Sequence, residues 1–457
     1  MASELPSMYK AYDIRGIYPD QINAETAYAI GQAYTRLIAP KTVAVGHDVR
    51  TSGPELYEAL IRGLTDAGVN VVKLGGISTE MLYFVVAHYG YDGGISVTAS
   101  HNPKEYNGMK MVRAGAEPIT GETGVMEIRD MVPGLIAEPT KAATPGTVTE
   151  LDFFDDFRTF VLSFIDTKNL KPVKLVANAN FGFQGQFAKR LFEGLPVELV
   201  LLNGEPDGTF PKGRPDPFLP ENRPEFLELI KSEGADLGVA WDADADRCFF
   251  ATGSGIFLES YFTNGILAKA ILEKHPGASI LYDVRYTWAS IDAISEAGGK
   301  PIEVRCGHSY IKTAMREHDA IFCGEASGHL YFRDYFYADT GFVPLLLMLE
   351  LLAVKNTTIG ELVKPYLEKY FVSGEINRKV ANADAIIAAL KEKYADATTV
   401  NELDRLTIEC GRDWRFNVRT SNTEPLLRLN LEANSQGLME TKRDEVLAFI
   451  DSIAVSA

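Results

Sequence analysis

Three stretches of the chain share one order of apolar and polar positions. They cover residues 42–74, 173–202 and 279–304. Each begins with a short apolar run rich in β-branched residues, continues with a helical period, and ends with a second apolar run after a glycine. A glycine directly behind the helical period is typical of a helix C-terminus. Each stretch therefore predicts a strand, a helix and a second strand, which is a crossover unit of a parallel sheet.

After residue 370 the pattern changes. Short apolar runs follow one another through turns, with helical periods only over 383–394 and 438–453. Strands that return through short turns predict a mostly antiparallel sheet. Segments rich in Pro, Gly and polar residues separate the earlier units. We therefore expect three tandem α/β domains with mixed or parallel sheets and a smaller C-terminal α+β domain, bounded at 1–147, 148–257, 258–369 and 370–457. One large doubly wound sheet is the alternative.

Composition narrows the function classes. The 457 residues include 45 Lys and Arg against 62 Asp and Glu, a net charge of −17. Such a surface repels nucleic acid, so any anionic metabolite needs a locally basic pocket. No signal peptide and no apolar run of about 18 residues is present, so we expect a cytoplasmic protein without a membrane partner. The four cysteines lie far apart, which favours reduced thiols over disulfides.

The run Ile95-Ser-Val-Thr-Ala-Ser-His-Asn-Pro reads as a strand that ends in polar residues. Reactive side chains of α/β sheets lie at the carboxyl ends of strands, which places Ser100 and His101 well. Adjacent residues of a strand point to opposite faces, so we expect His101 to be badly placed for taking the Ser100 proton. A polar turn that caps the next helix is the structural alternative.

The run Asp242-Ala-Asp-Ala-Asp-Arg lies between two apolar strands. Its three alternating carboxylates repel one another unless a cation neutralises them, and oxygen ligands suit Mg²⁺. The loop is no EF-hand, because the sixth position is Arg247. Phosphate oxygens commonly complete the coordination of Mg²⁺, and Arg247 suits a phosphate. A solvated acidic turn is the alternative.

Two further loops are rich in recognition chemistry. Gly324-Glu-Ala-Ser-Gly-His presents Glu325 and Ser327, which suit vicinal sugar hydroxyls. Arg419-Thr-Ser-Asn-Thr-Glu-Pro combines a planar guanidinium with hydroxyls and backbone amides that can surround a phosphate. Taken alone, each loop is also compatible with an ordinary turn. The sequence has no Walker loop and no post-strand G-x-G-x-x-G, so a nucleotide cofactor has no support.

With these loops in hand, the chain resembles the α-D-phosphohexomutase superfamily, within it the phosphomannomutase/phosphoglucomutase branch. The resemblance runs from Tyr12-Asp-Ile-Arg-Gly to Arg419–Pro425 and includes the Ser100, Asp242, Gly324 and Arg419 loops in the family's order. Gly46-His-Asp-Val-Arg-Thr-Ser-Gly and Gly307-His-Ser-Tyr-Ile-Lys add to it. The resemblance implies a heart-shaped enzyme of four domains around a central cleft. It further implies reversible transfer of a phosphoryl group between the 1- and 6-positions of mannose or glucose phosphates, through a hexose 1,6-bisphosphate.

The resemblance also implies roles for individual residues. Ser100 is the expected phosphoserine, and Mg²⁺ is expected on Ser100, Asp242, Asp244 and Asp246. The expected catalytic residues besides Ser100 are Arg15, Lys110, His308 and His329. The expected substrate-binding residues are Tyr12, Arg247, Arg285, His308, Gly324, Glu325, Ala326, Ser327, Gly328, His329, Arg419, Ser421, Asn422 and Thr423.

Several points stay open at this stage. Lys110 and His329 are the favoured proton carriers, without a choice between acid and base. Ala243 and Ala245 stand where the family commonly has glycines, and Arg285 where relatives often have lysine. The alternatives are a phosphoglucosamine mutase and a non-catalytic sugar-phosphate sensor. We expect a monomer or homodimer.

Overall fold

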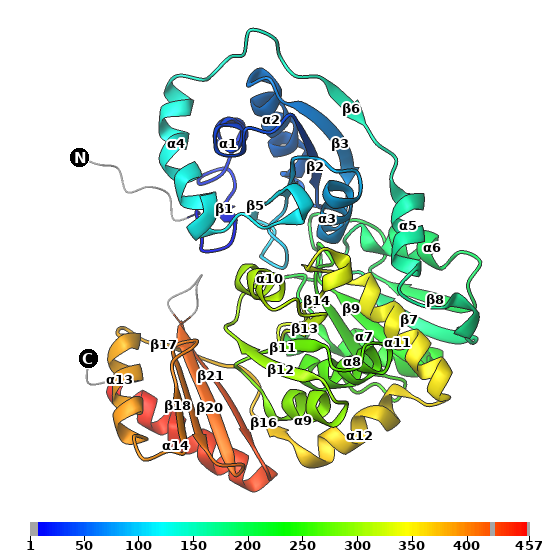
Figure 1. Ribbon diagram of the computed structural model, residues 1–457, viewed down its shortest axis with the longest axis vertical. Helices are drawn as coiled ribbons and strands as arrows, with labels where there is room; N and C mark the ends of the chain where they lie inside the picture. Colours follow the sequence, from blue (N-terminus) through cyan, green and yellow to red (C-terminus); the bar gives the residue numbers. More distant parts are fainter. Residues whose placement is uncertain (1–7, 421–425, 455–457) are drawn as a thin grey trace. The chain divides into compact units, whose positions relative to one another are not determined.

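The computed structural model describes residues 8–420 and 426–454, and they belong to two compact units (Figure 1). The first unit contains the chain up to Leu258 together with Ser327–Thr358. The second contains Glu259–Ala326 together with the chain from Ile359 on. Among the described residues, no single helix is long and apolar enough to span a membrane.

The first sheet of the first unit has the strand order β1-β5-β4-β2-β3-β6. Strand β2 is parallel to both β3 and β4, while β5 runs antiparallel to β1 and β4. The strands are β1 (Ile14–Ile17), β2 (Thr42–His47), β3 (Asn70–Gly76), β4 (Gly93–Val97), β5 (Tyr106–Arg113) and β6 (Val148–Glu150). The helices are α1 (Ala24–Ile38), α2 (Gly53–Asp66), α3 (Thr79–His88) and α4 (Met126–Ala137).

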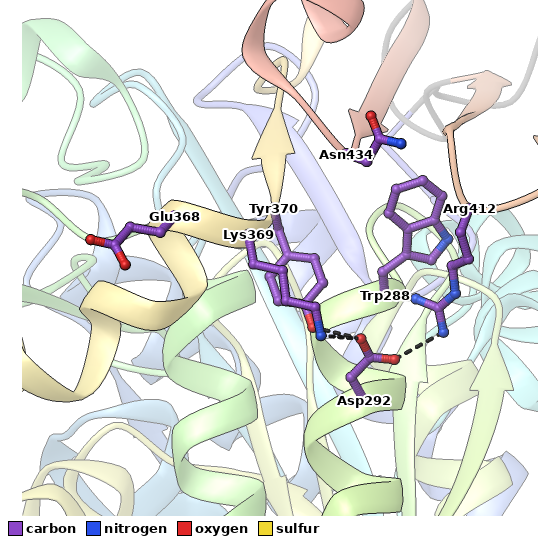
Figure 2. A pocket seen from close by; sticks show the side chains of 7 residues that line it. All are labelled: Trp288, Asp292, Glu368, Lys369, Tyr370, Arg412 and Asn434. Atoms are coloured by element: carbon purple, nitrogen blue, oxygen red, sulfur yellow. Dashed lines mark hydrogen bonds and ion pairs between the residues drawn. The ribbon is translucent and has the colours of Figure 1, made fainter.

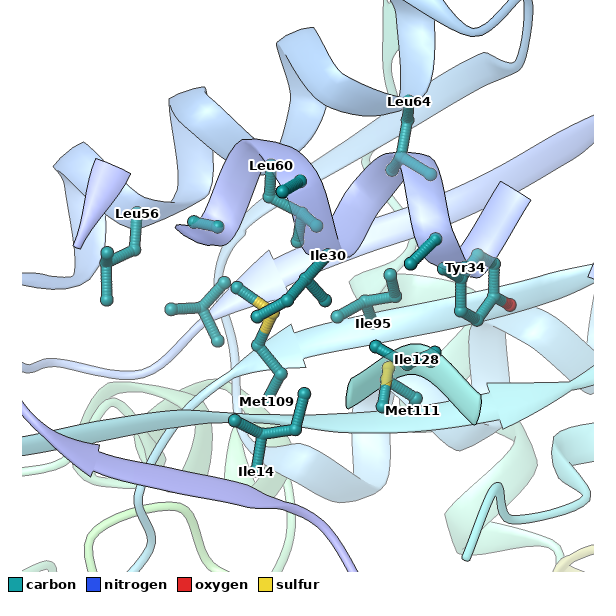
Figure 3. Packing of buried hydrophobic residues seen from close by; sticks show 14 of the residues in the cluster. Ile14, Ile30, Tyr34, Leu56, Leu60, Leu64, Ile95, Met109, Met111 and Ile128 are labelled. Carbon is teal, nitrogen blue, oxygen red and sulfur yellow. The ribbon is translucent and has the colours of Figure 1, made fainter. Parts of the chain in front are cut away.

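An apolar core holds this sheet against three of its helices (Figure 3). Ile30 of α1, Leu60 of α2 and Ile128 of α4 meet Ile95 and Met109 of the central strands, all of them buried. The alternation of strand side chains brings one apolar set to this face. The core thereby fixes the carboxyl ends of β2 and β4, from which two polar loops emerge.

The second sheet of the same unit has the order β10-β9-β7-β8. Its strands are β7 (Val173–Asn178), β8 (Val197–Leu202), β9 (Leu237–Trp241) and β10 (Cys248–Thr252), with helices α5 (Phe154–Leu162), α6 (Gln184–Phe192) and α7 (Pro224–Glu233). The returning segment contains β14 (Leu330–Phe332) and β15 (Ala338–Asp339), which pair antiparallel with each other and are not strands of this sheet, and the helix α11 (Phe342–Lys355). It is fixed to β9 because the Trp241 indole donates to the Gly341 carbonyl over 3.0 Å.

In the second unit, β11 is parallel to β12 and β13. These strands are β11 (Ser279–Asp283), β12 (Lys300–Val304) and β13 (Phe322–Gly324), with helices α8 (Ser260–Lys274), α9 (Trp288–Glu296), α10 (His308–Glu317) and α12 (Ile359–Lys369). An antiparallel sheet follows. It contains β16 (Phe371–Val372), β17 (Ile376–Lys379), β18 (Thr399–Asn401), β19 (Leu406–Cys410), β20 (Trp414–Thr420) and β21 (Leu426–Ala433), with helices α13 (Ala383–Lys393) and α14 (Gln436–Ala454).

The predicted crossovers are confirmed. The strand pairs β2–β3, β7–β8 and β11–β12 are each parallel and each enclose a helix. The strands of the described residues form four separate sheets, so the alternative of one large sheet is wrong. No disulfide joins the four cysteines, all of which lie in the described part of the chain.

Candidate active site

Ser100 lies three residues beyond the end of β4, in the loop that leads to β5. Its side chain is buried, and its Oγ donates to Asp242 Oδ2 over 2.7 Å. The Ser100 amide donates to Thr98 Oγ1 over 2.9 Å. Its φ of 50° places the backbone in the left-handed region, which a residue with a side chain enters at a cost in free energy. The loop therefore holds the hydroxyl against the acidic loop with a strained backbone.

The expectation that His101 is badly placed for taking the Ser100 proton is wrong. His101 Nδ1 lies 3.1 Å from Ser100 Oγ, within hydrogen-bonding distance. The expectation rested on extended backbone, whereas β4 ends at Val97 and the left-handed Ser100 breaks the alternation of side chains. Burial first, and then the positive charge of Arg247, holds the pKa of His101 well below its ordinary value.

The acidic loop follows β9 directly. Ligand oxygens of Asp242, Asp244 and Asp246 all lie within 4.8 Å of one another, and all three side chains are buried. Ala245 has a φ of 55° and is also left-handed. Ala245 thus adopts a backbone conformation that only glycine adopts without strain. The resulting turn brings the three carboxylates together.

Lys110, on β5, neutralises part of this cluster. Its Nζ donates to Asp244 Oδ2 over 2.7 Å and also to Asp246. Burial alone would lower the pKa of Lys110, but the two carboxylates outweigh burial and raise it. Burial and the neighbouring Asp246 and Asp244 raise the pKa of Asp242 well above its ordinary value. Repulsion among the three carboxylates therefore adds to the effect of burial at Asp242.

The donor set fits a hard divalent cation. Three carboxylates offer oxygen ligands, and the Ser100 side chain adjoins them through Asp242. The Oδ1 atom of Asp244 is buried and accepts no hydrogen bond from the described residues. A buried carboxylate oxygen without a donor is costly, and a metal ion satisfies it.

Basic side chains surround the Ser100 loop. Arg15, on β1, donates to Asp13 Oδ2 and to Asn102 Oδ1, each over 2.8 Å. Arg247 NH1 lies 3.7 Å from Asp216 Oδ1 and its NH2 lies 3.5 Å from His101 Nε2. Tyr12 is half-buried just before β1. The guanidinium groups of Arg15 and Arg247 supply positive charge beside the Ser100 loop, which suits an anion.

The returning segment brings His329 to the same cluster. His329 Nε2 lies 3.4 Å from Asp246 Oδ1, and its Nδ1 lies 2.9 Å from Ser327 Oγ. The carbonyl of Gly328 accepts from the Cys248 amide over 2.9 Å, which fixes this segment to β10. Both favoured proton carriers, Lys110 and His329, therefore contact Asp246.

The second unit holds a separate group of predicted site residues. Arg285, just beyond β11, is buried and donates to Asp283 Oδ2 over 2.7 Å and to Glu325 Oε1 over 2.9 Å. The Ala326 amide donates to Asp283 Oδ2 over 2.6 Å. Gly324 closes β13, and a Cβ there would lie 2.3 Å from Asn264 Cγ. Only glycine fits this close approach, which brings Glu325 to Arg285.

The same unit contains Arg419 and His308. Arg419, on β20, is buried and donates to Glu375 Oε2 over 3.1 Å. Its Nε has no hydrogen-bond acceptor among the described residues, so a donor for an anion remains. His308 begins α10 and is half-buried. The predicted residues Ser421, Asn422 and Thr423 lie outside the described residues.

A pocket elsewhere in the second unit contains none of the predicted site residues (Figure 2). At its centre Asp292 accepts from Lys369 Nζ over 2.9 Å, Tyr370 OH over 2.6 Å and Arg412 NH2 over 2.9 Å. Arg412 also lies 5.5 Å from the ring centre of Trp288. These contacts connect α9 to the end of α12 and to the β19–β20 turn. The polar groups at this pocket therefore serve packing between these elements.

Sequence reasoning missed residues that hold the site residues in place through hydrogen bonds. Thr79, at the start of α3, donates to Asp244 Oδ2 over 2.6 Å. Thr98 donates to Asp48 Oδ2 over 2.7 Å, and Arg50 donates to the Ser100 carbonyl over 2.6 Å. Asp48 and Arg50 belong to the Gly46–Gly53 motif, whose polar residues were the available signal. Thr79 stands outside every quoted motif, and no local pattern indicates its partner.

Four domain families match the chain in order. They are described as phosphoglucomutase/phosphomannomutase alpha/beta/alpha domains I, II and III and the C-terminal domain. The matched residues are 7–133, 152–255, 260–370 and 375–449. The four-domain architecture expected from the sequence is confirmed.

Curated relatives span nearly the whole chain. A phosphomannomutase of Salmonella montevideo is 43% identical over 451 residues, covering 97% of this chain and 99% of the relative. Proteins of Xanthomonas campestris described as phosphohexose mutases are 44% identical over 442 residues, covering 96% of this chain and 98% of the relative. These identities extend over all four matched domains.

Solved structures of related proteins have the same fold over nearly the whole chain. A crystal structure of a phosphoglucomutase/phosphomannomutase family protein from Burkholderia thailandensis has a TM-score of 0.87 and 33% identity, covering 98% of this chain and 97% of that one. One from Thermus thermophilus has a TM-score of 0.83 at 23% identity, which speaks for the fold alone. Together with the four motif loops, these similarities lead to one conclusion: the chain belongs to the phosphoglucomutase/phosphomannomutase family.

Proposed function

We propose that this protein moves a phosphoryl group reversibly between the 1- and 6-positions of mannose and glucose phosphates. One observation carries the proposal: the Ser100 hydroxyl is buried 2.7 Å from Asp242, at the edge of a three-carboxylate cluster. A serine in that place can be held as a phosphoserine and donate its phosphoryl group. The names of the relatives, phosphomannomutase and phosphohexose mutase, support the same reaction.

The reaction has two half-steps. In the first, the bond between phosphorus and Ser100 Oγ breaks and Oγ takes up a proton, while a bond forms to the free hydroxyl of the sugar phosphate, whose proton passes to a nearby base. The product is a hexose 1,6-bisphosphate. In the second, the bond between the other phosphoryl group and its sugar oxygen breaks and that oxygen takes up a proton. The phosphoryl group moves to Ser100 Oγ, which gives up its proton, and the isomeric monophosphate remains. Lys110, His329 and His101 are the candidates for moving the proton, because each lies beside Ser100 or its acidic neighbours.

Asp242, Asp244, Asp246 and an oxygen on Ser100 would hold Mg²⁺. When bound, the ion supplies positive charge that offsets the charge developing on the transferred phosphoryl group. Arg15 and Arg247, which contact Asn102 and His101 of the Ser100 loop, would contribute positive charge to the same balance. This assignment gives the unsatisfied Asp244 Oδ1 a partner.

Recognition of the sugar phosphate falls to other loops. Arg419, with a buried Nε that has no acceptor among the described residues, suits the phosphate that is not transferred. Glu325 and Ser327 suit sugar hydroxyls, and Arg285 orients Glu325. We assign supporting contacts to Tyr12, His308, Gly324, Ala326, Gly328, His329, Ser421, Asn422 and Thr423. A cytoplasmic location, a monomeric or dimeric state and domain bounds at residues 147, 257 and 369 stay predictions.

The test compares glucose 1-phosphate, mannose 1-phosphate and glucosamine 1-phosphate, each with Mg²⁺ and a trace of hexose 1,6-bisphosphate. Similar turnover of the first two supports the proposal, and a strong preference for the third assigns the protein to phosphoglucosamine. Ser100→Ala should abolish turnover, whereas the control Ser232→Ala, an exposed serine of α7, should not change it. No turnover by the unaltered protein contradicts the proposal and favours a sensor.

A further inference from the structure

A buried arginine outside the predicted site holds the loop that carries Ser100. Arg50 lies between β2 and α2, and only 1% of its surface is exposed. Its NH2 donates to the carbonyls of Ser100 and Asn102, each over 2.6 Å. Its NH1 donates to the carbonyls of Pro103 over 2.7 Å and Tyr106 over 2.9 Å. One guanidinium thus binds four carbonyls of the seven-residue stretch 100–106.

A second set of contacts fixes the guanidinium itself. Asp48 accepts from the Arg50 amide on Oδ1 over 3.0 Å and from Arg50 Nε on Oδ2 over 3.2 Å. The same Oδ2 accepts from Thr98 Oγ1, which in turn accepts from the Ser100 amide. The amide and the carbonyl of Ser100 are therefore both tied, by different routes, to the Asp48–Arg50 pair. On its other face the guanidinium lies 5.1 Å from the ring centre of Phe210.

These contacts act on the residue whose backbone is strained. Ser100 has a φ of 50°, and this conformation brings its Oγ to Asp242 and to His101 Nδ1. A free loop would relax toward negative φ, and the hydroxyl would turn away from both partners. Something must therefore hold the conformation. Arg50 binds the Ser100 carbonyl directly, and the planar fork of a guanidinium fixes several acceptors at once.

We propose that Arg50 is a positioning residue for phosphoryl transfer, which keeps Ser100 in its left-handed conformation by binding the carbonyls of the 100–106 loop. The inference rests on the proposed function of Ser100. Arg50 contacts neither the three carboxylates nor the predicted substrate ligands through any described hydrogen bond. Its effect therefore falls on the rate of transfer and leaves substrate affinity almost unchanged, because the recognition loops keep their own contacts.

The test is Arg50→Lys, which keeps the charge but replaces a planar fork by a single ammonium. The control is Arg158→Lys, because Arg158 also donates to backbone carbonyls, those of Leu191 and Glu193, far from the loop along the chain. Three quantities are measured: the thermal midpoint, the kcat and KM for a hexose 1-phosphate, and the rate at which hexose 1,6-bisphosphate phosphorylates Ser100, followed by intact mass spectrometry.

We expect Arg50→Lys to lower kcat and the phosphorylation rate by about 100-fold, with KM within about threefold of the unaltered protein. Arg158→Lys should keep both rates. A folded Arg50→Lys variant that phosphorylates Ser100 at the normal rate overturns the inference, as does a rise in KM at unchanged kcat. If the unaltered protein takes up no phosphoryl group on Ser100, the proposed function fails, and this inference fails with it.

Should Arg50→Lys not fold, Asp48→Asn replaces it. The amide keeps the size of the side chain and one acceptor, but weakens its hold on the guanidinium and on Thr98. We expect both rates to fall by about 10-fold with KM unchanged. Normal rates in Asp48→Asn, combined with an unfolded Arg50→Lys, would show a purely structural role and overturn the inference.

Discussion

Two arginines of this protein are equally buried, yet they hold their loops in different ways. Arg50, in the first unit, donates to four backbone carbonyls and has one carboxylate partner, Asp48. Arg415, on β20 of the second unit, pairs with Glu409 over 2.9 Å and Glu432 over 3.0 Å. It also donates to the carbonyls of Val284 and Arg285.

The difference appears in the electrostatics. Burial lowers the pKa of Arg50, and Asp48 restores only part of it. Burial also acts to lower the pKa of Arg415, but Glu432 and Glu409 outweigh it and raise the pKa above its ordinary value. Arg50 is therefore held mainly by directional hydrogen bonds of its planar guanidinium, and Arg415 mainly by ion pairs with two carboxylates. The Ser100 loop, for which we propose the chemistry, depends on directional contacts, while the Arg285 loop, for which we propose substrate recognition, depends on ion pairs.

The largest effect should come from the acidic loop of the first unit. Asp244→Asn removes one charge from the proposed Mg²⁺ site, and we expect activity to fall about 1,000-fold, with weaker Mg²⁺ binding in calorimetry. Removing the metal with EDTA should have the same effect on the unaltered protein. The exposed Asp155→Asn is the control. Unchanged Mg²⁺ affinity in Asp244→Asn would contradict the proposed Mg²⁺ site, and the contrast between a catalytic first unit and a recognising second unit would fail.

The contrast between the arginines predicts the next effect. Arg415→Met leaves Glu432 buried without its cation, and we expect a loss of about 3 kcal/mol in the unfolding free energy. Arg415→Lys keeps the charge and should lose less than about 1 kcal/mol, unlike Arg50→Lys, for which we expect a large loss of rate. Denaturant unfolding followed by tryptophan fluorescence measures both variants. Equal losses in the two Arg415 variants would mean that shape, rather than charge, also governs this site.

Arg419→Ala tests recognition in the second unit. Loss of a charge-assisted contact to phosphate should raise KM about 30-fold, or about 2 kcal/mol, with little change in kcat. Arg378→Ala, which removes an exposed partner of Asp451 in the same sheet, is the control. Steady-state kinetics with a hexose 1-phosphate measures the split. A fall in kcat at constant KM would assign Arg419 to the chemistry.

The last effect appears only as the pH changes, and it concerns a buried acid that joins parts of the first unit. Glu80 accepts from Thr340 and from the Gly341 amide at the start of α11, with Asp339 nearby. Burial raises the pKa of Glu80 from 4.5 to about 8, although these hydrogen bonds oppose the rise. The protonated form therefore stabilises the fold below pH 4.5, and this contribution is lost as the pH rises through about 8.

Glu80→Gln should remove that dependence. The unfolding free energy of the variant, relative to the unaltered protein, should rise with pH between about 5 and 8, by up to about 1 kcal/mol per pH unit. Thermal midpoints at three pH values measure it, with the exposed Glu228→Gln as control. A difference that is the same at every pH would mean that Glu80 stays ionised.

The sequence predicted most of what local pattern encodes. The crossover units were predictable because helix and strand periods are properties of neighbouring residues, and the Ser100 and Asp242 loops followed from polar residues behind strands. The position of His101 was not predictable from local pattern, because it depends on the left-handed φ of Ser100. The carbonyls that Arg50 binds and the Thr340 partner of Glu80 lie at least 50 residues away along the chain, where no local pattern reaches.

The make-up of the two units has a consequence for biosynthesis. The first unit is not contiguous in sequence. Its first piece ends at Leu258, and its second piece, Ser327–Thr358, follows only after a segment that belongs to the second unit. A ribosome delivers the chain from the N-terminus, and domains ordinarily fold as they emerge. Here the hydrogen bonds that join Trp241 and Glu80 to Gly341 can form only after Gly341 has been synthesised. Roughly three-quarters of the polypeptide must therefore be synthesised before the first unit is complete, and protection of the nascent chain matters until then.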